Sequence, residues 1–142
     1  MFPEGEVAVT SAFDTEFPDR FPAMTRQRRI LVVEDQEPLA VVIADVLGDS
    51  HEVVCVSNVT DAVDYLLSDS IDLVLLDCVL PDGPNWQVAL EADRQQIPVI
   101  LMTGDAEQAK ELIAGQRIYL LKPFAIAALL DAVHRADASP AV

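Results

Sequence analysis

The sequence predicts an α/β fold in which a five-stranded parallel sheet is doubly wound by helices in a (βα)5 order. Two features of the chain from residue 30 onward indicate this class. Short apolar runs rich in Val, Ile and Leu alternate five times with longer amphipathic stretches. The apolar runs are continuous, which is typical of parallel strands that helices cover on both faces.

Each apolar run has the length of a strand and is bounded by turn-forming residues. We expect strands at Ile30–Glu34, Glu52–Val56, Ile71–Asp77, Val99–Thr103 and Ile118–Leu121. Crossovers between parallel strands are right-handed almost without exception, so few arrangements of these elements are open. In open sheets of this class, binding sites form beyond the carboxyl ends of the strands. The residues at those ends are therefore the first candidates for function.

Apolar residues recur at helical spacing in the stretches between and after the strands. Gly48 is suited to ending the first of these helices, and Asn58 or Thr60 is suited to capping the second. We expect helices at roughly Pro38–Leu47, Asp61–Leu67, Asn85–Ala92, Glu107–Ala114 and Ala125–Ala136.

Length, charge and hydropathy restrict the class of protein. A chain of 142 residues, 51% of them hydrophobic, can form one globular domain with its own core. The net charge of −15 argues against nucleic acid and anionic membranes as partners. The apolar runs are too short to span a bilayer, and the acidic N-terminal region lacks the pattern of a signal peptide. We therefore expect a cytoplasmic protein.

The two cysteines and the two ends of the chain complete this survey. Cys55 and Cys78 lie in strand-like apolar runs without metal-ligand spacing, so we expect buried, reduced thiols. Residues 1–28 hold four of the five phenylalanines and predict an N-terminal extension, either flexible or docked on this domain or on a second copy. The domain itself is expected at 29–137, followed by a tail at 138–142.

Polar residues stand where four of the predicted strands end. The first strand delivers Glu34 and Asp35, the third Asp77, the fourth Thr103, and the fifth is followed by Lys122. Because the carboxyl ends of parallel strands meet at one edge of the sheet, we expect these side chains to share one shallow pocket.

This set of residue types indicates phosphoryl chemistry. Three carboxylates offer the hard oxygen ligands of Mg²⁺, which also keeps water and phosphate oxygens in its coordination shell. A cation would explain how Glu34 and Asp35 can stand side by side, because close like charges repel. A lysine can pair with Asp77 and then with a phosphoryl oxygen, and a threonine hydroxyl can donate to the same group. Since a carboxylate can act as a nucleophile, the set predicts Mg²⁺-assisted phosphoryl transfer onto an aspartate.

Four segments resemble, in this order, the receiver domains of two-component response regulators: "ILVVED", "DLVLLDCVLPDG", "PVILMTG" and "YLLKPF". Each segment alone is a weak signal, but the four in order are highly specific and cover about residues 29–137. The resemblance implies a flavodoxin-like fold with strand order 2-1-3-4-5. It also implies phosphotransfer from a sensor histidine kinase or a phosphotransfer protein, in the manner of a chemotaxis-regulator-like single-domain receiver.

Residue by residue, the resemblance implies that Asp77 is the phosphoacceptor. Asp35 would be a direct Mg²⁺ ligand, Glu34 would act mainly through water, and the backbone carbonyl of Val79 would complete the protein ligands. Mn²⁺ is a possible substitute for Mg²⁺ in such a site.

The resemblance also assigns roles near the ends of the last two strands. Thr103 and Lys122 would form the phosphate-sensing pair, Tyr119 would be the switch aromatic, and the peptide bond before Pro123 would be cis. The interval from Thr103 to Lys122 is short for the family, which implies that the fourth helix or its loops are trimmed.

We therefore expect a stand-alone receiver that is phosphorylated on Asp77 and signals through an unknown downstream protein. It would catalyse only its own phosphorylation and dephosphorylation and would not otherwise be an enzyme. A homodimer is possible. Two alternatives stay open. One is a pseudo-receiver that binds partners without taking phosphate. The other is a phosphohydrolase with an aspartyl-phosphate intermediate, which is disfavoured because that family has a second aspartate where this chain has Val79.

Overall fold

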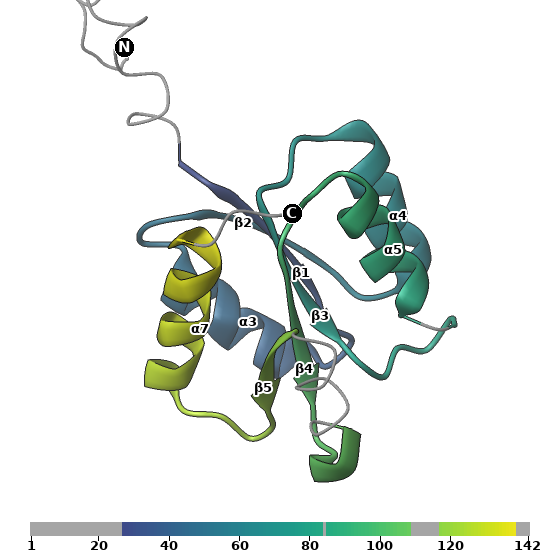
Figure 1. Cartoon of the computed structure of the whole chain (residues 1–142). Helices are drawn as coiled ribbons and strands as arrows, with labels where there is room; N and C mark the ends of the chain where they lie inside the picture. The colour runs from purple at the N-terminus through teal and green to yellow at the C-terminus, as the bar shows by residue number, and fades with distance from the viewer. Residues whose placement is uncertain (1–26, 84, 109–116, 139–142) are drawn as a thin grey trace, which may run out of the picture.

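The chain forms a single five-stranded parallel sheet with helices on both faces (Figure 1). A computed structural model describes residues 27–83, 85–108 and 117–138. The sheet order is β2-β1-β3-β4-β5, which confirms the expected flavodoxin-like arrangement. The elements are β1 (Arg29–Val33), α3 (Glu37–Leu47), β2 (Glu52–Val56), α4 (Val59–Ser68), β3 (Leu73–Asp77), α5 (Trp86–Arg94), β4 (Val99–Thr103), β5 (Ile118–Leu121) and α7 (Ile126–Ala138).

The predicted boundaries differ from the observed ones only at the ends of elements. The third strand begins at Leu73 and not at Ile71, because the Asp72 carboxylate turns back to accept from the backbone N–H of Arg29 at 2.8 Å. Of the predicted helix at Glu107–Ala114, residues 107 and 108 are helical, together with residue 106 before them, and the rest falls within 109–116, which lie outside the described residues. The predicted N-terminal extension up to residue 26 and the tail from residue 139 also lie outside them.

Two hydrophobic layers hold the sheet between its helices. Along β1, Ile30 and Val32 face the layer on the side of α3 and α7, whereas Leu31 and Val33 face the layer on the side of α4 and α5. Figure 1 shows the two helix pairs on opposite faces of the sheet. All residues of β3 and β4 are buried, so the strands that carry the site are fixed from both sides. Burying one such aliphatic side chain contributes about 1.5–3 kcal/mol.

The two cysteines are less buried than the sequence predicts. Neither thiol forms a disulfide, as expected, but Cys55 is exposed and Cys78 is only partly buried. β2 pairs with β1 on one side only, and its residues are therefore much less covered than those of β3. A continuous apolar run thus marks a parallel strand without showing whether it lies at the centre or at the edge of the sheet.

Local features explain where α4 begins and where α3 ends. The Asn58 side chain caps α4 by accepting from the backbone N–H of Asp61 at 2.8 Å. Gly48 ends α3 as predicted, with a right-handed backbone conformation (φ −67°). Within the described part of the chain, no helix has the length and apolar character needed to cross a membrane.

Replacing Asn58 with alanine should lower the free energy of unfolding by about 1 kcal/mol, because the α4 N-terminus loses a side-chain acceptor. Gln36→Ala is the matched control, since Gln36 holds the N-cap position of α3 and makes no side-chain capping bond. Chemical denaturation of both variants measures the difference. Equal losses in the two variants would contradict the capping role of Asn58.

Candidate functional site

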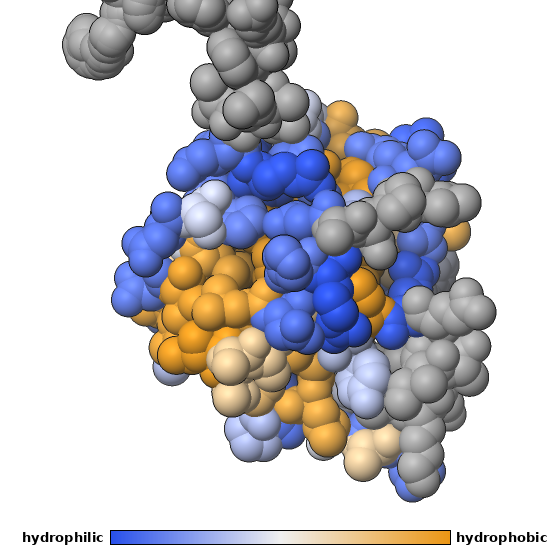
Figure 2. Space-filling view, turned by 60° about the vertical axis from the view of Figure 1, so that its left-hand side comes forward, coloured by the Kyte–Doolittle hydropathy of each residue, from blue (hydrophilic) through white to orange (hydrophobic). Residues whose placement is uncertain are grey.

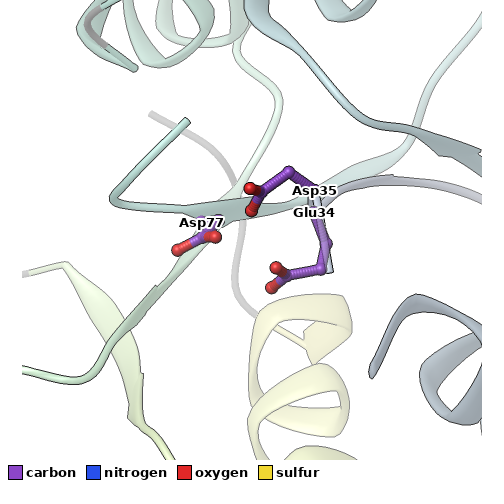
Figure 3. Close-up of side chains that lie close together, drawn as sticks. All are labelled: Glu34, Asp35 and Asp77. Carbon is purple, nitrogen blue, oxygen red and sulfur yellow. The ribbon is translucent and has the colours of Figure 1, made fainter. Parts of the chain in front are cut away.

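The site lies where the central strands end. Glu34 and Asp35 directly follow β1, and Asp77 is the last residue of β3. β1 and β3 are hydrogen-bonded neighbours whose register pairs Val33 with Leu76, so the residues that follow are brought next to each other. Figure 3 shows the three carboxylates converging from the two strand ends. The structure thus brings together the three carboxylates that the sequence placed at these strand ends.

The three carboxylates form one compact cluster. Each offers an oxygen, and these oxygens all lie within 4.8 Å of one another. Glu34 and Asp77 are almost completely buried, with 2% and 5% of their surface exposed, whereas Asp35 is exposed. Two buried acids and one exposed acid thus bring three carboxylates close together at the end of the sheet.

Lys122 directly follows the edge strand β5, and its side chain reaches this cluster from that side of the sheet. Its Nζ lies 2.8 Å from Glu34 Oε1 and 3.3 Å from Asp77 Oδ2. Its backbone N–H donates to the Thr103 carbonyl at 2.7 Å, which ties the end of β5 to the end of β4. Burial acts to lower the pKa of Lys122, but the hydrogen bond to Glu34 and the charge of Asp77 outweigh burial, so the pKa is raised. The lysine is therefore charged and pairs with both acids.

The surroundings of Glu34 destabilise the charged form of its carboxyl group. Burial raises the pKa of its carboxyl above the ordinary value of 4.5, and the like charge of Asp77 acts in the same direction. The hydrogen bonds from Lys122 and from the backbone N–H of Gln36 oppose this shift without cancelling it. One positive charge thus compensates the pocket only in part.

The remaining predicted site residues surround the cluster. The backbone N–H of Val79 donates to Asp77 Oδ1 at 3.2 Å, and the Val79 residue is 75% exposed at the mouth of the site. The peptide bond between Lys122 and Pro123 is cis. Tyr119 is partly buried and packs against the apolar layer on the α4 and α5 side. Tyr119 also lines an open hollow of about 540 Å³ beside α7, together with Phe124 and Leu121.

Two polar neighbours of the site were not predicted from the sequence. Asn85 donates from Nδ2 to the backbone carbonyl of Asp77 at 3.3 Å, and Gln108 accepts a hydrogen bond of 2.6 Å from the Thr103 hydroxyl. Both residues lie in predicted helices, but neither belongs to one of the four segments that resemble receiver domains. A glutamine five residues after a strand-end threonine has no signature until the backbone between them is placed.

Asp82, which stands in the sequence Pro-Asp-Gly after β3, links this loop to another element of the fold. Its carboxylate accepts from the backbone N–H groups of Val59 and Thr60, at 2.7 and 3.1 Å, and from the Thr60 hydroxyl at 3.0 Å. The hydrogen bond from Val59 is the largest of the effects that hold its pKa below the ordinary value. The loop that follows Asp77 is therefore attached to the N-terminus of α4.

The donor set fits a hard divalent cation. Among the described residues, the ligand atoms that converge at the cluster are carboxylate oxygens, which suit such a cation, and Asp35 is exposed to water. The partial compensation by Lys122 leaves a net negative charge for a cation to neutralise. Glu34, Asp35 and Asp77 are the residues whose oxygens could hold such an ion.

The comparison with protein families agrees with this geometry. The family model of the response regulator receiver domain matches residues 30–134. The chain belongs to this family. Receiver domains are the phosphoacceptor modules of two-component signalling, and membership of this family implies the same general role for this chain.

Solved receiver structures are similar over most of the chain. The receiver domain of a sensor histidine kinase from Pseudomonas aeruginosa PAO1, which has a magnesium ion coordinated in its active-site cleft, is 30% identical. That match has a TM-score of 0.71 and covers 80% of this chain and 100% of that one. The receiver domain of an HD domain-containing protein from Pseudomonas fluorescens Pf-5 is 28% identical, with a TM-score of 0.69, over 78% of this chain and 94% of that one.

A CheY-like receiver from Methanospirillum hungatei JF-1 shares the fold at 21% identity. Its TM-score is 0.68, and the match covers 78% of this chain and 93% of that one. The same sheet and helix arrangement is therefore kept at low sequence identity.

The raised pKa of Glu34 gives a prediction for stability against pH in the presence of a chelator. A carboxyl whose pKa is higher in the folded state makes the native protein bind more protons than the unfolded chain, so its contribution to stability falls as pH rises through the folded-state pKa. Glu34→Gln cannot ionise. The variant should therefore gain free energy of unfolding relative to wild type as pH rises above 4.5, until Glu34 is fully ionised.

The measurement is a set of denaturant titrations of both proteins from acidic to neutral pH. Glu37→Gln is the matched control, because Glu37 is an exposed glutamate on the first turn of α3. If the difference in free energy of unfolding between Glu34→Gln and wild type stays constant or shrinks as pH rises, the pKa of Glu34 is not raised in the folded protein.

Proposed function

We propose that this receiver domain accepts a phosphoryl group on Asp77 from a sensor histidine kinase or a phosphotransfer protein, and that the reaction depends on Mg²⁺. The observation that carries the proposal is the placement of the Asp77 carboxylate. It is nearly buried at the centre of an acid cluster and lies 3.3 Å from the Lys122 ammonium. Signalling through a downstream protein is part of the same proposal.

The chemical step is a displacement at phosphorus. An oxygen of Asp77 forms a bond to phosphorus while the bond between phosphorus and the donor histidine nitrogen breaks, and that nitrogen keeps the electron pair. Mg²⁺, when bound, neutralises the charge of the carboxylates and of the phosphoryl oxygens. Lys122 is within reach of Asp77 and supplies a fixed positive charge for a phosphoryl oxygen. The backbone N–H of Val79 holds Asp77 Oδ1 in place at 3.2 Å.

The response to phosphorylation is assigned to Thr103, Lys122 and Tyr119. The Thr103 hydroxyl is positioned at the end of β4, beside the pocket, and can donate to a phosphoryl oxygen once its present hydrogen bond is released. Movement of this strand end opens space that the partly buried Tyr119 ring can enter. This is a two-state element whose equilibrium a phosphoryl group can shift.

Exposed apolar side chains support the proposal of protein partners. Val41 and Val42 on α3, and Ile126 and Leu130 on α7, are each about half exposed. Figure 2 shows an apolar area on the side of the molecule where these two helices lie. α3 begins two residues after Asp35 and α7 four residues after Lys122, so both helices start near the acid cluster. A donor protein, or a second copy of the chain, that covers this apolar area would come close to Asp77.

The proposal predicts that incubation with Mg²⁺ and acetyl phosphate or phosphoramidate raises the intact mass by one phosphoryl group. Asp77→Asn should abolish the increase, because an amide lacks the nucleophilic oxygen pair of a carboxylate. Asp45→Asn, which changes an exposed aspartate on α3, should leave it unchanged. Full labelling of Asp77→Asn would contradict the assignment.

Two further outcomes distinguish the alternative functions. Failure of the wild-type protein to bind beryllofluoride in the presence of Mg²⁺ would favour a pseudo-receiver. Sustained release of inorganic phosphate from a generic phosphomonoester would favour a phosphohydrolase.

A further inference from the structure

We propose that Gln108 is a positioning residue that holds the Thr103 hydroxyl and thereby lowers the affinity of the site for a phosphoryl group. The inference rests on the proposed function, because it concerns how the same pocket takes its phosphoryl ligand. It adds a residue to the site that lies outside the acid cluster and outside the sequence motifs.

The hydrogen bonds of Thr103 carry the inference. Thr103 is 2% exposed, so water cannot replace its partners without a change in structure. Its Oγ1 donates to Gln108 Oε1 at 2.6 Å and accepts from the backbone N–H of Asp105 at 3.1 Å. A threonine hydroxyl has a single proton to donate. In this structure that proton is committed to Gln108.

The backbone after β4 places the glutamine for this contact. The Asp105 carboxylate accepts from the backbone N–H of Glu107 at 2.9 Å, which fixes the turn into the helical residues 106–108. Gln108 is partly buried, and its side chain reaches back to the end of β4. The hydrogen bond from Asp105 to Thr103 also orients the hydroxyl, so the amide oxygen of Gln108 is the group that receives its proton.

The consequence follows from competition for one proton. A phosphoryl group on Asp77 needs the Thr103 hydroxyl as a donor, so the hydrogen bond to Gln108 must break before the hydroxyl can turn to the phosphoryl oxygens. When the binding-competent arrangement is only partly populated, the apparent affinity falls by that fraction. A hydrogen bond between neutral groups contributes enough to lower the affinity about 2- to 10-fold. Gln108 thus favours the unphosphorylated arrangement of the strand end.

The test is a double-mutant cycle read by the binding of beryllofluoride at saturating Mg²⁺. Trp86, the one tryptophan of the chain, lies at the start of α5 and can report binding by fluorescence, with calorimetry as a second readout. The variants are Gln108→Met, Thr103→Val and the two combined. Gln27→Met is the matched control, because Gln27 is an exposed glutamine that precedes β1 at the opposite end of the sheet.

Gln108→Met should tighten beryllofluoride binding about 2- to 10-fold in the wild-type background and leave it unchanged in the Thr103→Val background. Unchanged or weaker binding in Gln108→Met, or an equal gain in both backgrounds, would overturn the inference while the proposed function stands. Absence of beryllofluoride binding to the wild-type protein would overturn the proposed function, and the inference with it.

A second measurement reports on the hydrogen bond without any phosphoryl mimic. In metal-free wild-type protein, the hydroxyl proton of Thr103 should exchange slowly enough to be observed by NMR, because it is buried and bonded. In Gln108→Met the same proton should be lost to fast exchange. A hydroxyl proton that is equally protected in both proteins would show that Gln108 does not hold it.

Discussion

The rest of the site depends on one constraint, which is the repulsion among Glu34, Asp35 and Asp77. The ammonium group of Lys122 offsets this repulsion only in part. The parallel topology makes this crowding unavoidable, because β1 and β3 are paired neighbours and deliver their last residues to one place. Two of the acids are also almost completely buried, so solvent screens their repulsion poorly. The pocket is therefore held together by the fold and not by its own charges. Sites that serve function often give up stability in this way.

The fold supplies that restraint through backbone hydrogen bonds just beyond the strand ends. The N–H of Glu34 donates to the Val56 carbonyl at 3.0 Å, and the N–H of Cys78 donates to the Met102 carbonyl at 2.9 Å. The strands that deliver the acids are paired with each other, and β3 and its neighbour β4 are fully buried, which prevents the acids from separating. A pocket held in this way can present its oxygens to a cation without prior rearrangement. The energetic cost of assembling the acids has then been met by folding, before any ligand arrives.

Much of this arrangement could be predicted from the sequence, because it depends on strand ends. Asp77 and Thr103 each close an apolar run, and parallel strands of one sheet must bring such residues to the same edge. The strand order came from the resemblance to receiver domains and not from periodicity. Side-chain contacts that depend on how loops are placed could not be predicted. The attachment of Asp82 to α4 joins residues 22 or 23 positions apart, and the contact from Thr103 to Gln108 depends on one turn of backbone. The exposure of Cys55 required knowing which strand lies at the edge.

The most direct test of this account is a pair of unfolding measurements on wild type and Asp35→Asn, each in chelator and in a few millimolar Mg²⁺. In chelator, Asp35→Asn should raise the free energy of unfolding by up to about 1 kcal/mol, since one close but partly solvated repulsion is removed. With Mg²⁺ the wild type should gain stability and the variant should not, because a ligand stabilises the native state in proportion to its affinity. A variant that is less stable than wild type in chelator, or that gains as much from Mg²⁺, would contradict the claim that these acids repel one another until a cation joins them.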